Sequence, residues 1–273
     1  MVWRFTASLD EFPGAAEAWL RRDPVRNTVP LTVLGRMRHG LWQDDPLLGW
    51  FTSGGEVRAA MLHTPPSPLL LGDIPLDTVA PLARELGERE ATGVNGPLRQ
   101  TEAFAAASGR AETARVSMRL YRLGALRPPS REGAARVAGE RDVELITQWM
   151  REFLAEAEPE IGHDDPAAQV KHRVGQGEFV LAEEAGRPVA MAGFSRPIIG
   201  MSRIGPVYTP PEFRRRGYGS VVTHGASRVA QEAGADLLLL FTDLANPTSN
   251  SVYQALGYEP VADYAAITLA ARS

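Results

Sequence analysis

The sequence predicts an α/β protein whose two halves repeat one arrangement of strands and helices. Segments with the alternating pattern of strands are interleaved along the chain with segments that have the period of helices. The order strand, helix, helix, hairpin, strand, helix, strand, helix, strand occurs twice, with an offset of roughly 130 residues. Between the two runs lies Pro128-Pro129-Ser130, without periodicity. We therefore expect two tandem domains, residues 1–125 and 134–273, joined by a linker at residues 126–133.

The first half opens with a strand and a helix whose start has a local signal. Ser8 and Glu11 have the spacing of a capping box, which predicts a helix from Ser8 to Leu20, and Pro13 limits how early its regular part begins. The further elements expected here are a helix at 31–38, a hairpin of 47–52 with 57–64, an apolar run at 69–71, a helix at 77–90, a strand at 93–94, a helix at 100–107 and a strand at 116–121.

The second half repeats this plan and ends on a pair of short strands. The expected elements are a strand at 134–137, helices at 142–157 and 165–173, a hairpin of 179–183 with 189–195, a strand at 201–209, a helix at 220–233, a strand at 237–241, a helix at 246–256, and strands at 258–261 and 264–269. The segment Leu237 to Phe241 is apolar throughout, which predicts a central strand covered on both faces.

Composition narrows the classes of function. The 273 residues suit two domains of about 130 residues each, which is near the usual domain size. The net charge of -4 gives no electrostatic case for a nucleic acid or an anionic membrane as partner. Without cysteine there is no disulfide, thiolate metal site or cysteine nucleophile, and the five histidines include no close pair, so we expect no metal. The N-terminus lacks the apolar core of a signal peptide, and no apolar run is long enough to span a bilayer, which predicts a cytoplasmic protein.

The stretch from Val207 to Ser220 predicts a loop that binds an anion. It leads from a strand end through three arginines to the start of a helix, whose first N–H groups lack partners and carry partial positive charge. Gly217 and Gly219 remove the side chains that would keep a phosphate from the backbone. The arginines are Arg214, Arg215 and Arg216, and guanidinium groups suit phosphate geometry. The alternative for a glycine pair alone is a solvated basic loop.

The spacing Arg214-x-x-Gly217-x-Gly219 resembles the acyl-CoA pyrophosphate loop of the GNAT N-acetyltransferase superfamily, Gln/Arg-x-x-Gly-x-Gly/Ala. A Rossmann fingerprint fits poorly because Val222 stands where its third glycine belongs, and no Gly-Lys-Ser/Thr of a P-loop occurs. A second stretch, Asn246-x-x-Ser249-x-x-Val252-Tyr253-x-x-Leu256-Gly257-Tyr258, resembles the C-terminal GNAT signature Asn-x-x-Ala-x-x-Leu-Tyr-x-x-x-Gly-Phe.

This resemblance implies two tandem GNAT-like domains, each a mixed, largely antiparallel sheet flanked by helices. Residues 134–273 would be a complete catalytic domain. Residues 1–125 would be a degenerate copy, because the position of the anion loop holds Asp73 and Asp77 and no arginine. Carboxylates there would repel a pyrophosphate, so we expect one CoA per chain.

The resemblance also implies a donor, acetyl-CoA, and a set of residues that contact it. These are Val207, Tyr208 and Thr209, whose backbone pairs with the pantetheine arm, the loop residues Arg214, Arg215, Arg216, Gly217, Tyr218, Gly219 and Ser220, and Asn246 and Asn250. A backbone N–H of the strand before the loop can also polarise the thioester carbonyl. Tyr253 becomes the general acid for the departing thiolate, since a phenol of pKa near 10 stays protonated at neutral pH.

The base that deprotonates the acceptor is left open by the sequence. Glu183 and its neighbour Glu184 lie at a strand end, and Asp243 follows the apolar strand. The run His163-Asp164-Asp165 falls between two helices, where the family's acceptor pocket is usually walled. Each also has a structural explanation, as hairpin charge, loop charge or helix cap.

These inferences predict an N-acetyltransferase that moves an acetyl group to a primary amine by direct attack in a ternary complex. The acceptor would be a small-molecule or peptide amine, with no nucleic acid or membrane partner, and the protein would be a monomer or homodimer. The alternative is a CoA-binding, non-catalytic regulatory or structural GNAT-like protein. A nucleic-acid binder that uses Arg214 to Arg216 is disfavoured by the net charge.

Overall fold

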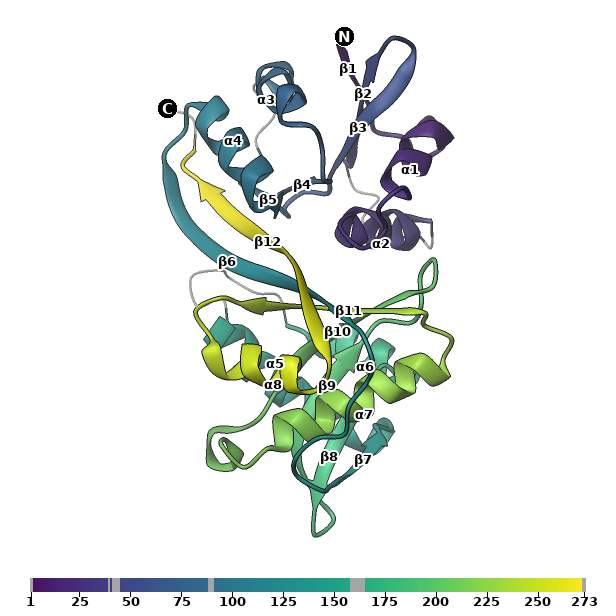
Figure 1. Cartoon of the computed structure of the whole chain (residues 1–273), viewed down its shortest axis with the longest axis vertical. Helices are drawn as coiled ribbons and strands as arrows, with labels where there is room; N and C mark the ends of the chain where they lie inside the picture. Colours follow the sequence, from purple (N-terminus) through teal and green to yellow (C-terminus); the bar gives the residue numbers. More distant parts are fainter. Residues whose placement is uncertain (1, 39, 41–44, 88–90, 158–164, 272–273) are drawn as a thin grey trace. The chain divides into compact units, whose positions relative to one another are not determined.

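The computed structural model describes residues 2–38, 40, 45–87, 91–157 and 165–271, and these fold into two compact units (Figure 1). Unit 1 comprises Met1–Leu120, Thr242–Ala245 and Pro260–Ser273, and unit 2 comprises Tyr121–Phe241 and Asn246–Glu259.

Unit 1 is a mixed sheet with helices. Its elements are β1 (Val2–Thr6), α1 (Gly14–Leu20), α2 (Thr28–Met37), β2 (Leu47–Ser53), β3 (Glu56–His63), β4 (Leu69–Leu71), a 3-10 turn (Leu76–Thr78), α3 (Val79–Leu86), β5 (Gly93–Pro97), α4 (Leu98–Ser108) and β6 (Glu112–Leu123), whose last three residues belong to unit 2. The strand order is β1-β2-β3-β4-β5-β12-β6, in which β12 is the C-terminal strand Tyr258–Leu269. The pair β4–β5 is parallel, and the pairs β1–β2, β2–β3, β3–β4 and β5–β12 are antiparallel.

The first helix begins later than its sequence signal predicts. Helix α1 starts at Gly14, after Pro13 in the N-cap position. The expected capping box does not form, because the Glu11 carboxylate accepts a hydrogen bond of 2.5 Å from the hydroxyl of Thr6. The capping-box prediction was therefore wrong, while the limit set by the proline holds.

The C-terminal strand β12 (Tyr258–Leu269) completes the sheet of unit 1. It is one continuous strand, where the sequence predicted two short ones. Residues Tyr264 to Thr268 pair antiparallel with β5, from Pro97 to Gly93. This pairing explains why residues 260–273 group with unit 1, whereas the boundaries predicted from sequence place them with the second half.

Unit 2 contains a smaller mixed sheet. Its elements are β7 (Ala134–Val137), a 3-10 turn (Glu140–Asp142), α5 (Val143–Ala157), α6 (Ala167–Gly175), β8 (Phe179–Glu184), β9 (Arg187–Phe194), β10 (Met201–Tyr208), a 3-10 turn (Pro211–Phe213), α7 (Tyr218–Glu232), α8 (Pro247–Ala255) and β11 (Leu237–Asp243), whose last two residues belong to unit 1. The strand order is β11-β10-β9-β8-β7, with β10–β11 parallel and the pairs β9–β10, β8–β9 and β7–β8 antiparallel. The predicted fold class, mixed and largely antiparallel sheets with flanking helices, is confirmed.

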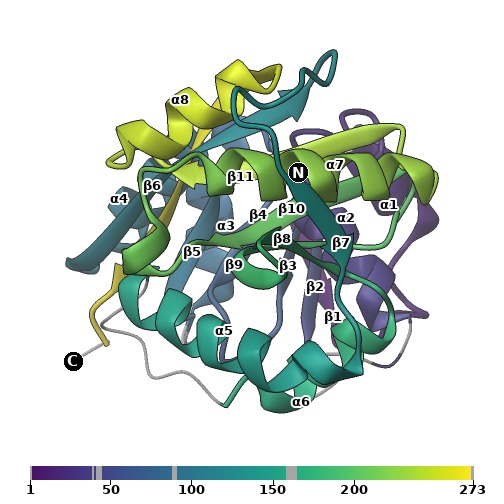
Figure 2. The same cartoon turned by 90° about the horizontal axis from the view of Figure 1, so that it is seen from below.

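Helices cover both faces of the unit 2 strands (Figure 2). Helix α5 buries Ile146, Trp149 and Met150, which lie at helical spacing, in a core with the inward residues of β8 and β9. Helices α7 and α8 pack into a second core, which includes Val222 and Leu256. The two cores hold β8, β9 and β10 between them.

The parallel pair β10–β11 stays in register over a short length only. Residues Met201 to Arg203 face Leu237 to Leu239, and within the described pairing that register ends there. Strand β10 runs on to Tyr208 with β9 as its partner, through an irregularity between Ile204 and Val207. The C-terminal half of β10 can therefore offer backbone groups on its β11 side, directly before the anion loop.

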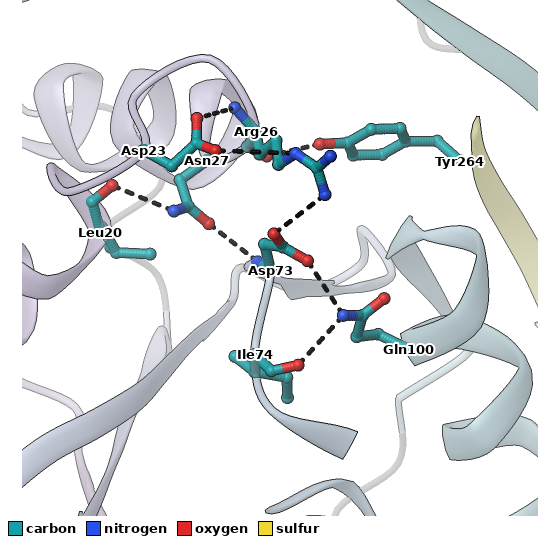
Figure 3. Close-up of polar contacts among 8 residues, drawn as sticks. All are labelled: Leu20, Asp23, Arg26, Asn27, Asp73, Ile74, Gln100 and Tyr264. Carbon is teal, nitrogen blue, oxygen red and sulfur yellow. Dashed lines mark hydrogen bonds and ion pairs between the residues drawn. The ribbon is translucent and has the colours of Figure 1, made fainter. Parts of the chain in front are cut away.

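In unit 1, a polar cluster fixes the loop that follows β4 (Figure 3). The Asp73 carboxylate accepts hydrogen bonds from Arg26 at 3.2 Å and from Gln100 at 3.0 Å. The side-chain oxygen of Asn27 accepts from the Asp73 N–H at 2.9 Å, and the Tyr264 hydroxyl donates to the Arg26 carbonyl at 2.5 Å. A carboxylate with its own cationic partner thus follows β4, where the second half has its arginine loop.

Candidate active site

The loop between β10 and α7 turns sharply at two residues with left-handed backbone. Gly217 is the N-cap of α7 at φ 82°, a conformation that glycine adopts at little cost. Arg215 has φ 61°, which is uncommon for a residue with a side chain. The loop therefore enters the helix along a path that depends on Gly217.

The first turn of α7 has the shape and donors of a phosphate cradle. The N–H groups of Ser220 and Val221 donate to the Gly217 carbonyl at 3.1 and 3.2 Å. The N–H groups of the two residues before Ser220 come ahead of these first bonds of the helix, where backbone donors have no intrahelical acceptor. A Cβ at Gly219 would have one neighbour within 4 Å, the Thr209 hydroxyl at 3.7 Å. These backbone donors fit the charge and size of a phosphate group.

The three loop arginines are not equivalent. The guanidinium of Arg214 binds both carboxylate oxygens of Glu156, at 2.7 and 2.8 Å, and its Nε donates to the Thr209 carbonyl at 2.8 Å. Its charge is therefore paired with helix α5, and the proximity of Glu156 raises the pKa of the Arg214 guanidinium. Arg215 and Arg216 are exposed and remain better placed to add charge for an anion.

The end of β10 carries a buried phenol beside a carboxylate that sequence reasoning missed. Val207 and Thr209 are half-buried, and Tyr208 between them is buried against Trp149. The Tyr208 hydroxyl donates to Glu152 at 2.9 Å. Burial, and then the Glu152 carboxylate, raises the pKa of Tyr208 to about 12. The one signal for Glu152 in the sequence is its position one helical turn after Trp149.

The two predicted asparagines of α8 are engaged close to the start of that helix. The Asn246 side chain accepts a hydrogen bond from the Ser249 N–H at 3.0 Å, which is an N-cap. The Asn250 amide donates to the Asn246 carbonyl at 2.8 Å and accepts from the Tyr121 hydroxyl at 2.8 Å. Tyr121 belongs to the last residues of β6, and nothing in the sequence pattern assigns it this contact.

Tyr253 lies in the core of unit 2 at 8% exposure. Its ring meets that of Tyr258 edge-on, with the centroids 6.3 Å apart. Burial raises the pKa of Tyr253 to about 12, so its phenol is protonated at neutral pH. The Tyr258 hydroxyl has a different partner, the Ser227 hydroxyl at 2.7 Å.

The carboxylates predicted as bases have structural partners. Glu183 accepts from the Arg136 Nε at 2.7 Å, and the other nitrogens of that guanidinium bind Asp142 at 2.7 and 2.9 Å. Asp243 ends β11 and accepts from the Ala245 N–H at 2.7 Å.

The third candidate group is described in part. His163 and Asp164 lie outside the described residues, and Asp165 binds Arg151 at 2.9 Å. In the described ranges there is no cluster of three or more His, Asp or Glu side chains that could hold a metal ion, and no helix there is both long and apolar enough to cross a membrane. That the reaction needs no metal stays a prediction.

The fold and the loop define an α/β protein with a strand–loop–helix unit in its second half, in which a glycine opens the first turn of the helix. Residues 143–258 match the model of the acetyltransferase (GNAT) family, and this part of the chain, which includes the loop and α8, belongs to that family. No curated protein is similar enough to the sequence to count as a match.

Solved structures extend the fold match over the whole chain. A GNAT-family acetyltransferase from Colwellia psychrerythraea is 10% identical with a TM-score of 0.64, covering 99% of this chain and 100% of that one. A GCN5-related N-acetyltransferase from Sphaerobacter thermophilus is 16% identical with a TM-score of 0.65, covering 99% and 96%. A tandem GNAT protein from the clavulanic acid biosynthesis pathway is 13% identical with a TM-score of 0.58, covering 99% of each chain. At these identities the likeness is one of fold, and it confirms the tandem GNAT architecture.

Proposed function

We propose that the protein is an N-acetyltransferase that moves an acetyl group from acetyl-CoA to a primary amine. The observation that carries this proposal is the glycine-opened first turn of α7, which lies in a segment of the GNAT family. The acceptor is a small-molecule or peptide amine, and the active form is a monomer or a homodimer. Neither nucleic acid nor a membrane is required.

Acetyl-CoA supplies the acetyl group as a thioester, and the residues of unit 2 divide the work of binding it. The first N–H groups of α7, with Arg215 and Arg216, hold the phosphates. Backbone groups of Val207 to Thr209 on the open side of β10 pair with the pantetheine arm and polarise the thioester carbonyl. Asn246 and Asn250 act from the start of α8, and their existing hydrogen bonds give these side chains a defined orientation.

The chemical step needs one proton removed and one delivered. The amine nitrogen bonds to the acetyl carbonyl carbon, the carbon–sulfur bond breaks, and the thiolate receives a proton. Tyr253 delivers that proton, since its pKa of about 12 keeps the phenol protonated at neutral pH. The proton lost by the amine goes to a carboxylate, for which Glu183 and Asp243 stay candidates. Glu152, at the end of β10 through Tyr208, is a third.

Kinetics of a Tyr253→Phe variant test the proposal. The full-length chain is assayed for thiol release from acetyl-CoA over a panel of primary amines, and acetyl-CoA affinity is measured separately. Loss of a general acid should lower kcat roughly 100-fold while the Kd for acetyl-CoA changes less than about twofold. Tyr258→Phe is the matched control, because it removes a neighbouring buried hydroxyl that is bonded to Ser227. Equal losses of turnover and affinity in Tyr253→Phe would make Tyr253 a binding residue.

The same assay separates the enzyme from a non-catalytic CoA-binding protein. One observation favours that alternative: Tyr253 is buried in the core against Tyr258, as a purely structural tyrosine would be. A protein that binds acetyl-CoA tightly, but acetylates no amine and releases no thiol, would have this second function.

A further inference from the structure

The segment before β7 runs along helix α7 in a fixed register. A Cβ added at Gly133 would lie 3.0 Å from Val221 Cγ1, and one added at Gly225 would lie 2.6 Å from Ala135 Cβ. An advance of two residues along the extended segment, from 133 to 135, thus matches an advance of four residues along the helix, from 221 to 225. The two distances agree, since two extended residues and four helical residues each span about 6 Å. A Cβ at Gly225 would clash with Ala135 and one at Gly133 would crowd Val221, so the close approach of the two segments depends on these glycines.

The same register brings Arg131 to the anion loop. A Cβ at Gly217, one helical turn before Val221, would lie 3.1 Å from Arg131 Cβ and 3.4 Å from its Cδ. The aliphatic stem of Arg131 therefore lies against the N-cap residue of α7. The contacts of residues 133–135 with α7 fix this position of Arg131, which is not one of the residues of the loop motif.

The guanidinium of Arg131 is held beside the loop by one carboxylate. It stacks on the ring of Tyr218 at 4.3 Å from the centroid, and its Nη2 lies 2.6 Å from Glu184 Oε1 and 3.2 Å from the Tyr218 hydroxyl. The side chains of Arg131 and Glu184 are 37% and 45% exposed, so this ion pair is open to solvent. An exposed pair of this kind is weak enough to exchange partners.

We propose that Arg131 binds a phosphate group of the acyl-CoA co-substrate, and that Glu184 is the internal counter-ion which this phosphate replaces. The inference rests on the proposed function. Arg214, the arginine of the motif, is bound to Glu156 by two hydrogen bonds. A guanidinium from outside the loop can therefore supply the charge that Arg214 would otherwise direct to a phosphate. Arg131 can turn toward a phosphate while its stem stays on Gly217, and a phosphate offers the guanidinium the same paired acceptors as the Glu184 carboxylate.

Opposite charge changes at the two residues should shift CoA affinity in opposite directions. Arg131→Met keeps the stem on Gly217 and removes the charge, and should raise the Kd for CoA about tenfold with a weaker dependence on salt. Glu184→Gln removes the competitor and should lower the Kd about threefold at low salt. In the double variant, the loss of Glu184 should have no further effect. Calorimetric titration of the full-length chain with CoA gives all of these values.

The matched control is Arg228→Gln, which removes the same charge from α7, the helix whose N-cap residue Arg131 contacts. Arg228 pairs with Glu232, and it lies roughly 16 Å along the helix from Gly217. Its Kd should equal that of the wild type. Titration with dephospho-CoA identifies the phosphate: an effect of Arg131→Met that vanishes points to the 3′-phosphate, and one that persists points to the pyrophosphate.

An unchanged Kd for CoA in Arg131→Met, or a raised Kd in Glu184→Gln, would overturn the inference. The proposed function would stand in that case, provided that the wild-type protein binds CoA. A wild-type protein that binds no CoA would instead remove the proposed function, so the two failures are distinguishable. If Arg131→Met does not fold, Arg131→Lys and Glu184→Gln carry the test, with an intermediate Kd expected for the lysine.

Discussion

Replacing Gly217 by glutamate should abolish the stabilisation of the protein by CoA. Gly217 is the N-cap of α7 at φ 82°, and the new carboxylate would project beside the N–H groups that we assign to a phosphate. At a ligand concentration 100 times Kd, bound CoA adds about 2.7 kcal/mol to the free energy of unfolding. For a protein of this size, that corresponds to a Tm increase of roughly 5–10 °C. The variant should lose all of it.

The substitution also destabilises the protein without ligand, and this effect has to be separated. A left-handed backbone costs a residue with a side chain about 1–2 kcal/mol, and a Cβ here would lie 3.1 Å from Arg131 Cβ. Gly234→Glu is the matched control. Gly234 ends the same helix at φ 93°, with no heavy atom within 4 Å of an added Cβ.

Differential scanning fluorimetry with and without CoA reads both effects. Both variants should show a lower Tm than the wild type without ligand, because both place a side chain on left-handed backbone. Only Gly217→Glu should lose the CoA-dependent increase. A variant of Gly217 that keeps most of the increase, or a Gly234 variant that loses it, would refute the assignment of the loop.

Three further predictions concern other parts of the chain. Titration calorimetry should give one CoA per chain, because Asp73, which is paired with Arg26, follows β4 where an anion loop would lie. A stoichiometry of two would contradict this. Asp142→Ala should cost roughly 2–4 kcal/mol in urea unfolding, since it leaves Arg136 without its main partner. Glu232→Ala, which breaks an exposed ion pair with Arg228, should cost less than about 1 kcal/mol. The Arg136 guanidinium lowers the pKa of Asp142. The stability that the Asp142 carboxylate contributes is therefore present above the ordinary aspartate pKa and is lost as pH falls through the lowered value. An Asp142→Ala variant should show a weaker loss of stability in acid. Burial raises the pKa of Tyr253 to about 12. The contribution of the protonated phenol to stability is therefore full below about pH 10 and is lost between about pH 10 and 12. This loss of stability should be smaller in Tyr253→Phe.

The sequence by itself determined the fold class and the position of the loop, because those signals are local. The left-handed turn at Gly217 and the cap at Asn246 each depend on a few neighbouring residues, so a spacing pattern suffices to find them. Strand and helix periods likewise gave the order of elements in both halves. The start of α1 was one exception, since Glu11 bonds to Thr6, a residue before the predicted cap. Strand β12 was another, since it is continuous where two short strands were predicted.

Tertiary structure decided which partners the charged and polar side chains take. The sequence shows that Arg214, Glu152 and Arg131 are charged, but pairing Arg214 with Glu156 or Tyr208 with Glu152 joins residues more than fifty positions apart. The place of Arg131 against Gly217 depends on glycine contacts between an extended segment and a helix far along the chain. The pairing of β12 with β5 spans most of the chain. Such contacts leave no local pattern, because many residues of the same charge or polarity could satisfy them, and the folded backbone alone selects among these.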